Sequence, residues 1–238
     1  MTGTGRQPLM AHLEELRNRI FKVALAIVAG SIAAFVFRNW IFDLLVEPYE
    51  RVASARDLAF FKPTEAFSLF MRISFFGGFV LASPVVIYQL WAFISPALTK
   101  REKRYVIPLV AVLVILFLGG IAFGYWSLQR GLGFLLDFGS DRLDPTIGGG
   151  FYLTFALRFL LVFGIAFEFP VFLFAAAAVG VVGWRQLAKG RRWAVLLIVT
   201  IGAVVTPSGD PLTLLLLSGP LYVLYELTIW LVRFILRR

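Results

Sequence analysis

Six apolar stretches constrain the fold of this sequence more than any other feature. They cover about residues 21–37, 67–91, 105–126, 151–182, 193–205 and 212–232. A helix needs about 20 apolar residues to cross a hydrocarbon core of roughly 30 Å. With 60% hydrophobic and 16% charged residues, the chain has more apolar surface than a water-soluble domain can bury. We therefore expect an all-α membrane protein with six transmembrane helices in a single membrane domain, residues 1–238.

The first stretch follows a basic segment, as the apolar part of a signal peptide would. It remains apolar through Phe37 and five further stretches follow it, so we interpret it as a retained first span.

Lysine and arginine residues are unevenly distributed between the predicted loops. Fifteen of the 23 fall on one side, in residues 1–22, 95–104, 183–192 and 233–238, and six fall on the other side. Because basic loops remain in the cytoplasm, this pattern predicts that both termini are cytoplasmic. The net charge of +9 then reflects membrane topology, and nucleic acid is not an expected partner.

The last two stretches are short. The fifth has about 13 apolar residues, roughly 20 Å of helix, and the sixth is uninterrupted for about 14 residues before Glu226. The turn between them, residues 206–211, lacks basic residues, which fits a helical hairpin that ends under the outer leaflet and thins the bilayer locally. Alternatively, residues 227–232 continue the sixth helix past Glu226, and length alone favours neither interpretation.

Two carboxylates lie in basic segments on the side predicted to be cytoplasmic. Residues 1–20 include an amphipathic helix, expected on the inner membrane surface, which carries Glu15. Glu102 lies among four basic residues in the loop 95–104. The simpler interpretations are an i,i+4 ion pair of Glu15 with Arg19 and a solvated loop around Glu102. Either carboxylate could instead bind an incoming guanidinium group, by a charge-assisted hydrogen bond of roughly 1.5 to 3 kcal/mol.

Glu168 lies near the middle of the fourth stretch, where a charge costs roughly 2.5 to 3.5 kcal/mol on insertion scales. Arg158 is too far along the same helix to pair with it directly. Pro170 should kink the helix near Ala166. A polar site and a structural kink are both compatible with this pattern.

The segment 38–66 should form one or two short helices over the outer face. The next helix should begin near Glu65, with Thr64 as its N-cap.

The residues needed for intramembrane hydrolysis are missing. No predicted span contains an aspartate, the only histidine is His12, and there is no cysteine. Hydrolysis requires a nucleophile with a base or a pair of aspartates. We therefore expect neither an enzyme nor a bound metal or cofactor.

Five ordered motifs carry a family resemblance. They are HLEELR at residues 12–17, PTEAF at 63–67, SP at 83–84 continuing through YQLWAFISPAL at 88–98, FEFP at 167–170, and TP at 206–207 continuing through DP at 210–211. In this order the motifs resemble TatC, the multispanning receptor subunit of the twin-arginine protein translocase.

The resemblance implies a cup-shaped receptor of six helices, the fifth and sixth short, in the cytoplasmic membrane of a bacterium or archaeon. It implies export of folded proteins driven by the proton motive force. The implied partners are twin-arginine signal peptides, single-span subunits of the TatA and TatB type, further copies of the chain and the lipid bilayer.

The resemblance also implies roles for nine residues. These are a signal-peptide site at Glu15, Glu102, Phe93, Leu16 and Arg17, an intramembrane polar or partner contact at Glu168 and Thr206, and outer-face structural positions at Pro48 and Asp210.

Two other classes of protein stay open on the residues alone. One is a proton-coupled small-solute transporter that uses Glu168 and Arg158 as its polar pathway. The other is a structural scaffold for other membrane proteins, which would tolerate substitution of either glutamate in the predicted signal site.

Overall fold

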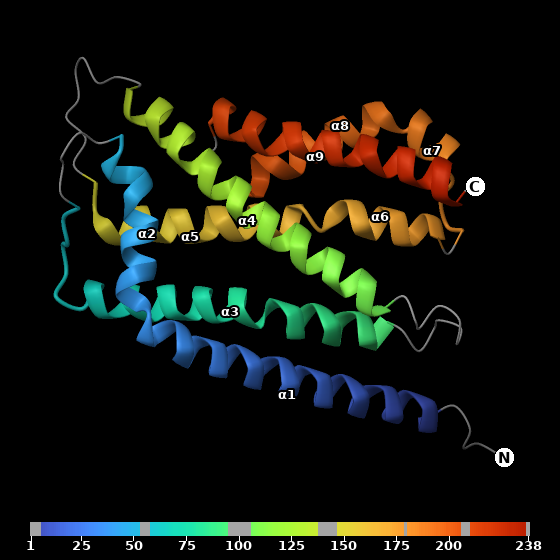
Figure 1. Ribbon diagram of the computed structural model, residues 1–238, viewed down its shortest axis with the longest axis horizontal. Helices are drawn as coiled ribbons and strands as arrows, with labels where there is room; N and C mark the ends of the chain where they lie inside the picture. Colours follow the sequence, from blue (N-terminus) through green and yellow to red (C-terminus); the bar gives the residue numbers. More distant parts are fainter. Residues whose placement is uncertain are drawn as a thin grey trace. The chain divides into compact units, whose positions relative to one another are not determined.

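The computed structural model describes residues 6–52, 58–94, 106–137, 147–178, 180–205 and 210–236. Within these ranges the fold is all-α, as predicted, and the only strand-like pairing is one bridge between Ala59 and Gly148. The helices shown in Figure 1 are α1 (Arg6–Val36), α2 (Arg38–Glu50), α3 (Glu65–Ile94), α4 (Val106–Asp137), α5 (Gly149–Ala166), α6 (Phe169–Ala178), α7 (Trp184–Lys189), α8 (Arg191–Val205), α9 (Pro211–Leu231) and a final π-helical turn, η3 (Val232–Leu236).

In the part of the chain that the structure describes, five helical segments are long and apolar enough to cross a membrane. They are Leu13–Val36, Glu65–Phe93, Ile107–Asp137, Gly149–Ala178 and Pro211–Ile235. The remaining apolar helix, α8, corresponds to the fifth predicted stretch and has 15 residues, about 22 Å at 1.5 Å per residue. The prediction of a multispanning helical protein with a short fifth helix is therefore confirmed.

The chain groups into two compact units, Met1–Phe42 with Phe67–Ile115, and Asp43–Ala66 with Leu116–Arg238. In the first unit α1 and α3 lie side by side (Figure 1), and they come close at Gly30 and Gly78. A Cβ atom on Gly30 would lie 2.6 Å from the Gly78 carbonyl oxygen. Only glycine allows the two backbones to approach this closely.

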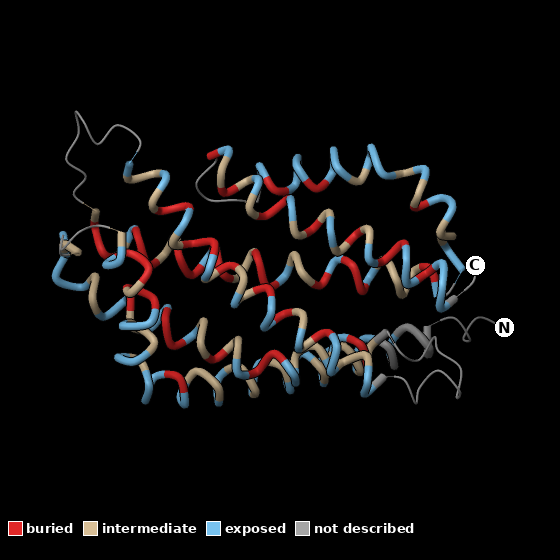
Figure 2. The backbone as a smooth tube through the Cα atoms, turned by 45° about the horizontal axis from the view of Figure 1, so that its top comes forward, coloured by how far each residue is buried: buried red, intermediate tan, exposed pale blue. Residues whose placement is uncertain are grey.

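In the second unit α5 forms much of the core. Leu153, Phe159 and Phe163 are completely buried, and Figure 2 shows the contrast with α8, which is mostly exposed. The helix α4 crosses α5 closely, because a Cβ atom on Gly120 would lie 2.6 Å from the Phe163 carbonyl oxygen. On the other side of this unit α9 packs against α6, α7 and α8.

The amphipathic segment expected in residues 1–20 is not a separate helix. Its described part continues without a break into the first span, since α1 extends from Arg6 to Val36. The sequence explains the continuity, because no proline follows Pro8 within α1 and the first glycine is Gly30.

The fourth span breaks where the sequence predicted a kink. The helix α5 ends at Ala166 and α6 begins at Phe169, with a turn at Phe167 and Glu168 between them. Proline at position 170 lacks the N–H that would bond to the Ala166 carbonyl. The kink prediction is confirmed.

The sixth helix does not stop at Glu226. The helix α9 continues to Leu231 and η3 extends the helical path to Leu236. Of the two alternatives, the structure has the continuous helix, so this span is not short. The carboxylate is tolerated within it because Arg191 and Tyr222 both bond to it.

The segment 38–66 contains one described helix, α2, as predicted. Residues 58–61 are extended, and α3 begins at Glu65, directly after Thr64. The fourth predicted stretch ended at residue 182, and α6 ends at Ala178; the third ended at residue 126, whereas α4 continues to Asp137.

Candidate functional site

An open hollow of about 390 Å³ lies along the N-terminal part of α1. Two acids, two bases and an amide line it, namely Glu14, Glu15, Asn18, Arg19 and Lys22. These residues come from two successive turns of one helix, where positions three and four apart share a face. The hollow therefore presents carboxylates within a segment that is otherwise basic.

The Glu15 carboxylate in this hollow is already engaged by Arg19, as the simpler interpretation of the sequence predicted. Arg19 donates to Glu15 Oε1 from Nε at 3.0 Å and from Nη2 at 2.5 Å. Its third donor, Nη1, bonds to Gln89 Oε1 on α3 at 3.2 Å. The sequence did not indicate Gln89, because 70 residues separate it from Arg19.

The other predicted signal-site residues are placed around this contact. Phe93 is half-buried on α3 and lies one helical turn after Gln89, so the two share a face. On α1, Leu16 is half-buried and Arg17 is exposed. Glu102 lies outside the described residues, as does the side chain of His12 in the same motif.

Glu168 is a buried acid at the break between α5 and α6. It is 9% exposed, and neither carboxylate oxygen has a hydrogen-bond partner among the described residues. Arg158 is exposed on α5 and lies nearly three turns earlier. The pairing of these two residues into a polar pathway is absent from the described part of the chain.

Pro48 is buried within α2, and tyrosines on two other helices contact main-chain carbonyls that precede it. Tyr125 Oη on α4 lies 2.9 Å from the Leu44 carbonyl oxygen, and Tyr152 Oη on α5 donates to the Leu45 carbonyl at 2.7 Å. These carbonyls precede Pro48 by four and three residues. Pro48, for which the resemblance implies an outer-face structural role, therefore lies at a buried position of the second unit.

Asp210 is the N-cap of α9. Its Oδ1 accepts a hydrogen bond from the Thr213 main-chain N–H at 2.8 Å, and its Oδ2 contacts the Thr213 hydroxyl. A carboxylate at this position pairs with a donor that the helix leaves unpaired. Thr206, the other predicted residue of this turn, lies outside the described residues.

Glu65 has a larger role than the sequence suggested. Its side chain accepts from the main-chain N–H groups of Phe61 at 2.9 Å, Lys62 at 3.2 Å and Gly150 at 2.9 Å. One carboxylate therefore joins the start of α3, the extended segment before it and the start of α5. In the sequence, an acid in the first turn of a helix indicated only a local role for Glu65. The bond to Gly150 joins residues that are 85 positions apart, and the sequence pattern did not reveal it.

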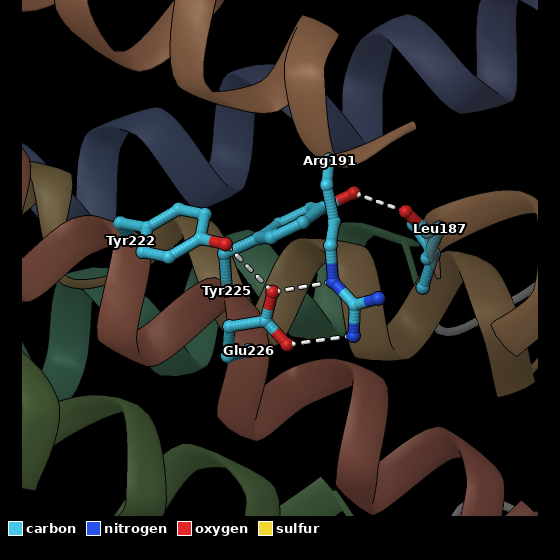
Figure 3. Close-up of polar contacts among 5 residues, drawn as sticks. All are labelled: Leu187, Arg191, Tyr222, Tyr225 and Glu226. Carbon is cyan, nitrogen blue, oxygen red and sulfur yellow. Dashed lines mark hydrogen bonds and ion pairs between the residues drawn. The ribbon is translucent and has the colours of Figure 1, made fainter. Parts of the chain in front are cut away.

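A second polar cluster, which sequence reasoning missed, joins α8 and α9 (Figure 3). Arg191 donates to both carboxylate oxygens of Glu226, from Nε at 2.6 Å and from Nη2 at 3.0 Å. Tyr222 donates to the same carboxylate at 2.9 Å, and Tyr225 Oη donates to the Leu187 carbonyl at 2.8 Å. A glutamate within an apolar span was the signal that a partner exists.

These features define a multispanning, all-α membrane protein with an acid-containing hollow at one end of its first helix and a buried acid at a break in its fourth span. The sequence model of the family described as Sec-independent protein translocase protein (TatC) matches residues 11–220. The chain belongs to the TatC family, and it is therefore a component of a Sec-independent protein translocase.

Individual relatives agree with this assignment. The TatC protein of Carboxydothermus hydrogenoformans is 37% identical over 95% of this chain and 93% of its own length. That of Aquifex aeolicus is 39% identical over 94% of each chain. A crystal structure of a twin arginine translocase receptor, TatC, superposes with a TM-score of 0.81 at 37% identity, covering 95% of this chain and all of that one.

The comparisons also bear on the transporter class that the residues had left open. The resemblance to TatC drawn from five short motifs is confirmed over nearly the whole chain. A proton-coupled small-solute transporter has no support among the relatives, which are named as translocase proteins.

Proposed function

We propose that this translocase component is the receptor for twin-arginine signal peptides, and that the hollow on α1 receives one of the two arginines. The observation that carries the proposal is the half-buried Glu15 carboxylate in that hollow, which holds a guanidinium group in the structure. A site that binds an internal arginine through Nε and Nη2 has the chemistry needed for an external one.

The second arginine is assigned to Glu102, which lies in the sequence between α3 and α4. Two carboxylates for two guanidinium groups give charge complementarity and directional hydrogen bonds. Phe93, Leu16 and Arg17 are assigned to the surrounding surface, where Phe93 and Leu16 offer apolar contact to the hydrophobic part of the peptide.

The proposal places both termini and the hollow on the cytoplasmic side of the cytoplasmic membrane, consistent with the excess of lysine and arginine in those segments. Partners of the TatA and TatB type and further copies of the chain are assigned to the polar positions at Glu168 and Thr206. The proton motive force supplies the energy, about 2.3 kcal/mol per charge per 100 mV. The chain contributes binding and assembly, not catalysis.

A binding measurement with purified protein in lipid nanodiscs tests the proposal. The probe is a fluorescent signal peptide with consecutive arginines, and its anisotropy is followed against protein concentration. We expect Glu15→Gln to weaken binding about tenfold, because a charge-assisted bond is lost, and Glu15→Gln with Glu102→Gln to abolish it. The matched control is Glu50→Gln, which removes an exposed acid from α2 and should leave binding unchanged.

Two results would refute the receptor site. One is undiminished binding to the double variant. The other is equal affinity of the unsubstituted protein for a peptide with lysines in place of both arginines.

A further inference from the structure

Two arginines lie against one tryptophan at an end of the second compact unit. The guanidinium carbon of Arg233, on η3, lies 4.9 Å from the centre of the Trp184 ring, and that of Arg185, on α7, lies 5.5 Å from the same centre. All three residues belong to this unit, in which α7 packs against α9. Both arginines are exposed, and neither forms an ion pair with an acid in the described part of the chain.

Contact with the tryptophan ring leaves the donors of each guanidinium available. An arginine over an aromatic face keeps its N–H groups in the guanidinium plane, where they can still donate hydrogen bonds. Two positive charges beside one ring repel each other, and an anion that accepts bonds from both offsets this repulsion. Guanidinium groups bind phosphate oxygens in this way. The pair is therefore suited to a group that contains phosphate.

An apolar groove of about 230 Å³ lies along α9 close to this pair. Its lining residues are Tyr222, Val223, Glu226, Leu227 and Trp230. Trp230 is three positions before Arg233, nearly one helical turn, so the groove approaches the arginine pair along one face of the helix. Arg191 donates two hydrogen bonds to the Glu226 carboxylate. The one acid in the groove is therefore neutralised and does not prevent an apolar occupant.

We propose that Arg185, Arg233 and Trp184 bind the headgroup of an anionic phospholipid, one acyl chain of which lies in the groove along α9. Charge complementarity selects this occupant. The groove alone would also fit a helix of another protein, whereas two guanidinium groups without an acid require an anion beside it. Tryptophan is common at the depth of lipid headgroups, and basic pockets there bind acidic lipids. The inference is independent of the proposed signal-peptide site, which belongs to the first unit.

Native mass spectrometry of the full-length protein tests the proposal. The protein is released from detergent micelles that contain equal amounts of phosphatidylglycerol and phosphatidylcholine, and the retained lipids are counted. We expect the parent protein to prefer phosphatidylglycerol about fivefold or more, and Arg185→Gln with Arg233→Gln to lose the preference. Trp184→Leu, which leaves the charge unchanged, should lower the preference about twofold, because both arginines lose their contact with the ring.

The matched control is Lys189→Gln with Arg192→Gln, which removes two exposed bases from the same region of the chain. It should keep most of the preference. Arg185→Lys with Arg233→Lys keeps both charges without the planar donors and should give an intermediate preference. Melting temperatures verify that each variant is folded, and the lysine variant decides the matter if the glutamine variant is not.

Three results would overturn the inference. Equal losses in the site variant and the control would mean that acidic lipids respond only to the total charge of this region. The absence of any preference in the parent protein would leave the groove to a helix of another protein. In the third case, millimolar inorganic phosphate raises the melting temperature as much as phosphatidylglycerol does, which would indicate a site for free anions. We expect the lipid alone to raise the melting temperature, because only the lipid also fills the groove.

Discussion

The Tyr125 hydroxyl on α4 lies 2.9 Å from the main-chain carbonyl oxygen of Leu44 on α2. In an unbroken helix that carbonyl would accept from the N–H of residue 48, which is proline and has none. The same hydroxyl lies 2.9 Å from Glu47 Oε2, and its single proton is shared between the two acceptors. A tyrosine from another helix thus satisfies the carbonyl that a buried proline leaves unpaired.

Removing this hydroxyl should destabilise the protein in a way that depends on Pro48. We expect Tyr125→Phe to lower the free energy of unfolding by about 1 kcal/mol. In a Pro48→Ala background the loss should be smaller, because alanine supplies the missing N–H. Denaturant unfolding in detergent measures both, and Tyr88→Phe, at an exposed tyrosine on α3, is the control. Equal losses in the two backgrounds would show that Pro48 and Tyr125 act independently.

Glu47 should make the stability of this region depend on pH. Its hydrogen bond from Tyr125, followed by its contact with Arg51, holds the pKa of the carboxyl below its ordinary value near 4.5. A lowered pKa in the folded state means stabilisation above pH 4.5 that is lost as the pH falls through the folded value. We therefore expect the melting temperature of Glu47→Gln to lie below that of the parent protein at pH 7. The two melting temperatures should converge at acid pH. A difference that stays constant with pH would contradict the stabilising role given to the Glu47 carboxylate.

A methyl group at position 150 should disrupt the contacts of Glu65. A Cβ atom there would overlap Glu65 Oε1, which bonds to the Gly150 N–H at 2.9 Å. We expect Gly150→Ala to lower the melting temperature by several degrees and to expose the segment 58–64 to added protease. The control, Gly119→Ala, adds a methyl group that meets nothing within 4 Å, and it should be neutral or slightly stabilising. Similar melting temperatures for the two variants would exclude the role given to Glu65.

Arg191 and Glu226 should behave as a coupled pair between α8 and α9. Each single change, Arg191→Gln or Glu226→Gln, should lower the melting temperature, because it leaves the other charge without its bidentate partner. The double variant should be less damaged than the two single losses predict when added. Thermal unfolding of the four proteins gives the coupling, and strict additivity would mean that the contact is not maintained in the membrane.

Glu168 should reduce stability in the native protein. A buried carboxyl with no hydrogen-bond partner among the described residues is costly, so Glu168→Leu should raise the free energy of unfolding by about 1 to 3 kcal/mol. If the acid serves contacts with partner subunits, the more stable variant should assemble less well with them in crosslinking assays. A less stable Glu168→Leu protein would indicate that the acid has a structural partner.

Helix positions and breaks were largely predictable because they depend on local properties of the chain. Within lipid the backbone must satisfy its own hydrogen bonds, so each long apolar run becomes a helix. Pro170 similarly predicted the break before α6, since the missing N–H is a property of one residue. Glu226 was ambiguous, because run length alone could not reveal whether a partner made the carboxylate acceptable within α9.

The amino-acid sequence by itself determined the helical class, the approximate spans and the family, through the length of its apolar runs and the order of its motifs. Tertiary structure alone decided which polar groups meet: Gln89 with Arg19, Tyr125 with the Leu44 carbonyl, and Arg191 with Glu226. Hydrophobic patterning carries information over a few helical turns, whereas a hydrogen bond requires two groups within about 3 Å. Segments far apart in the sequence reach that distance only once their helices have packed.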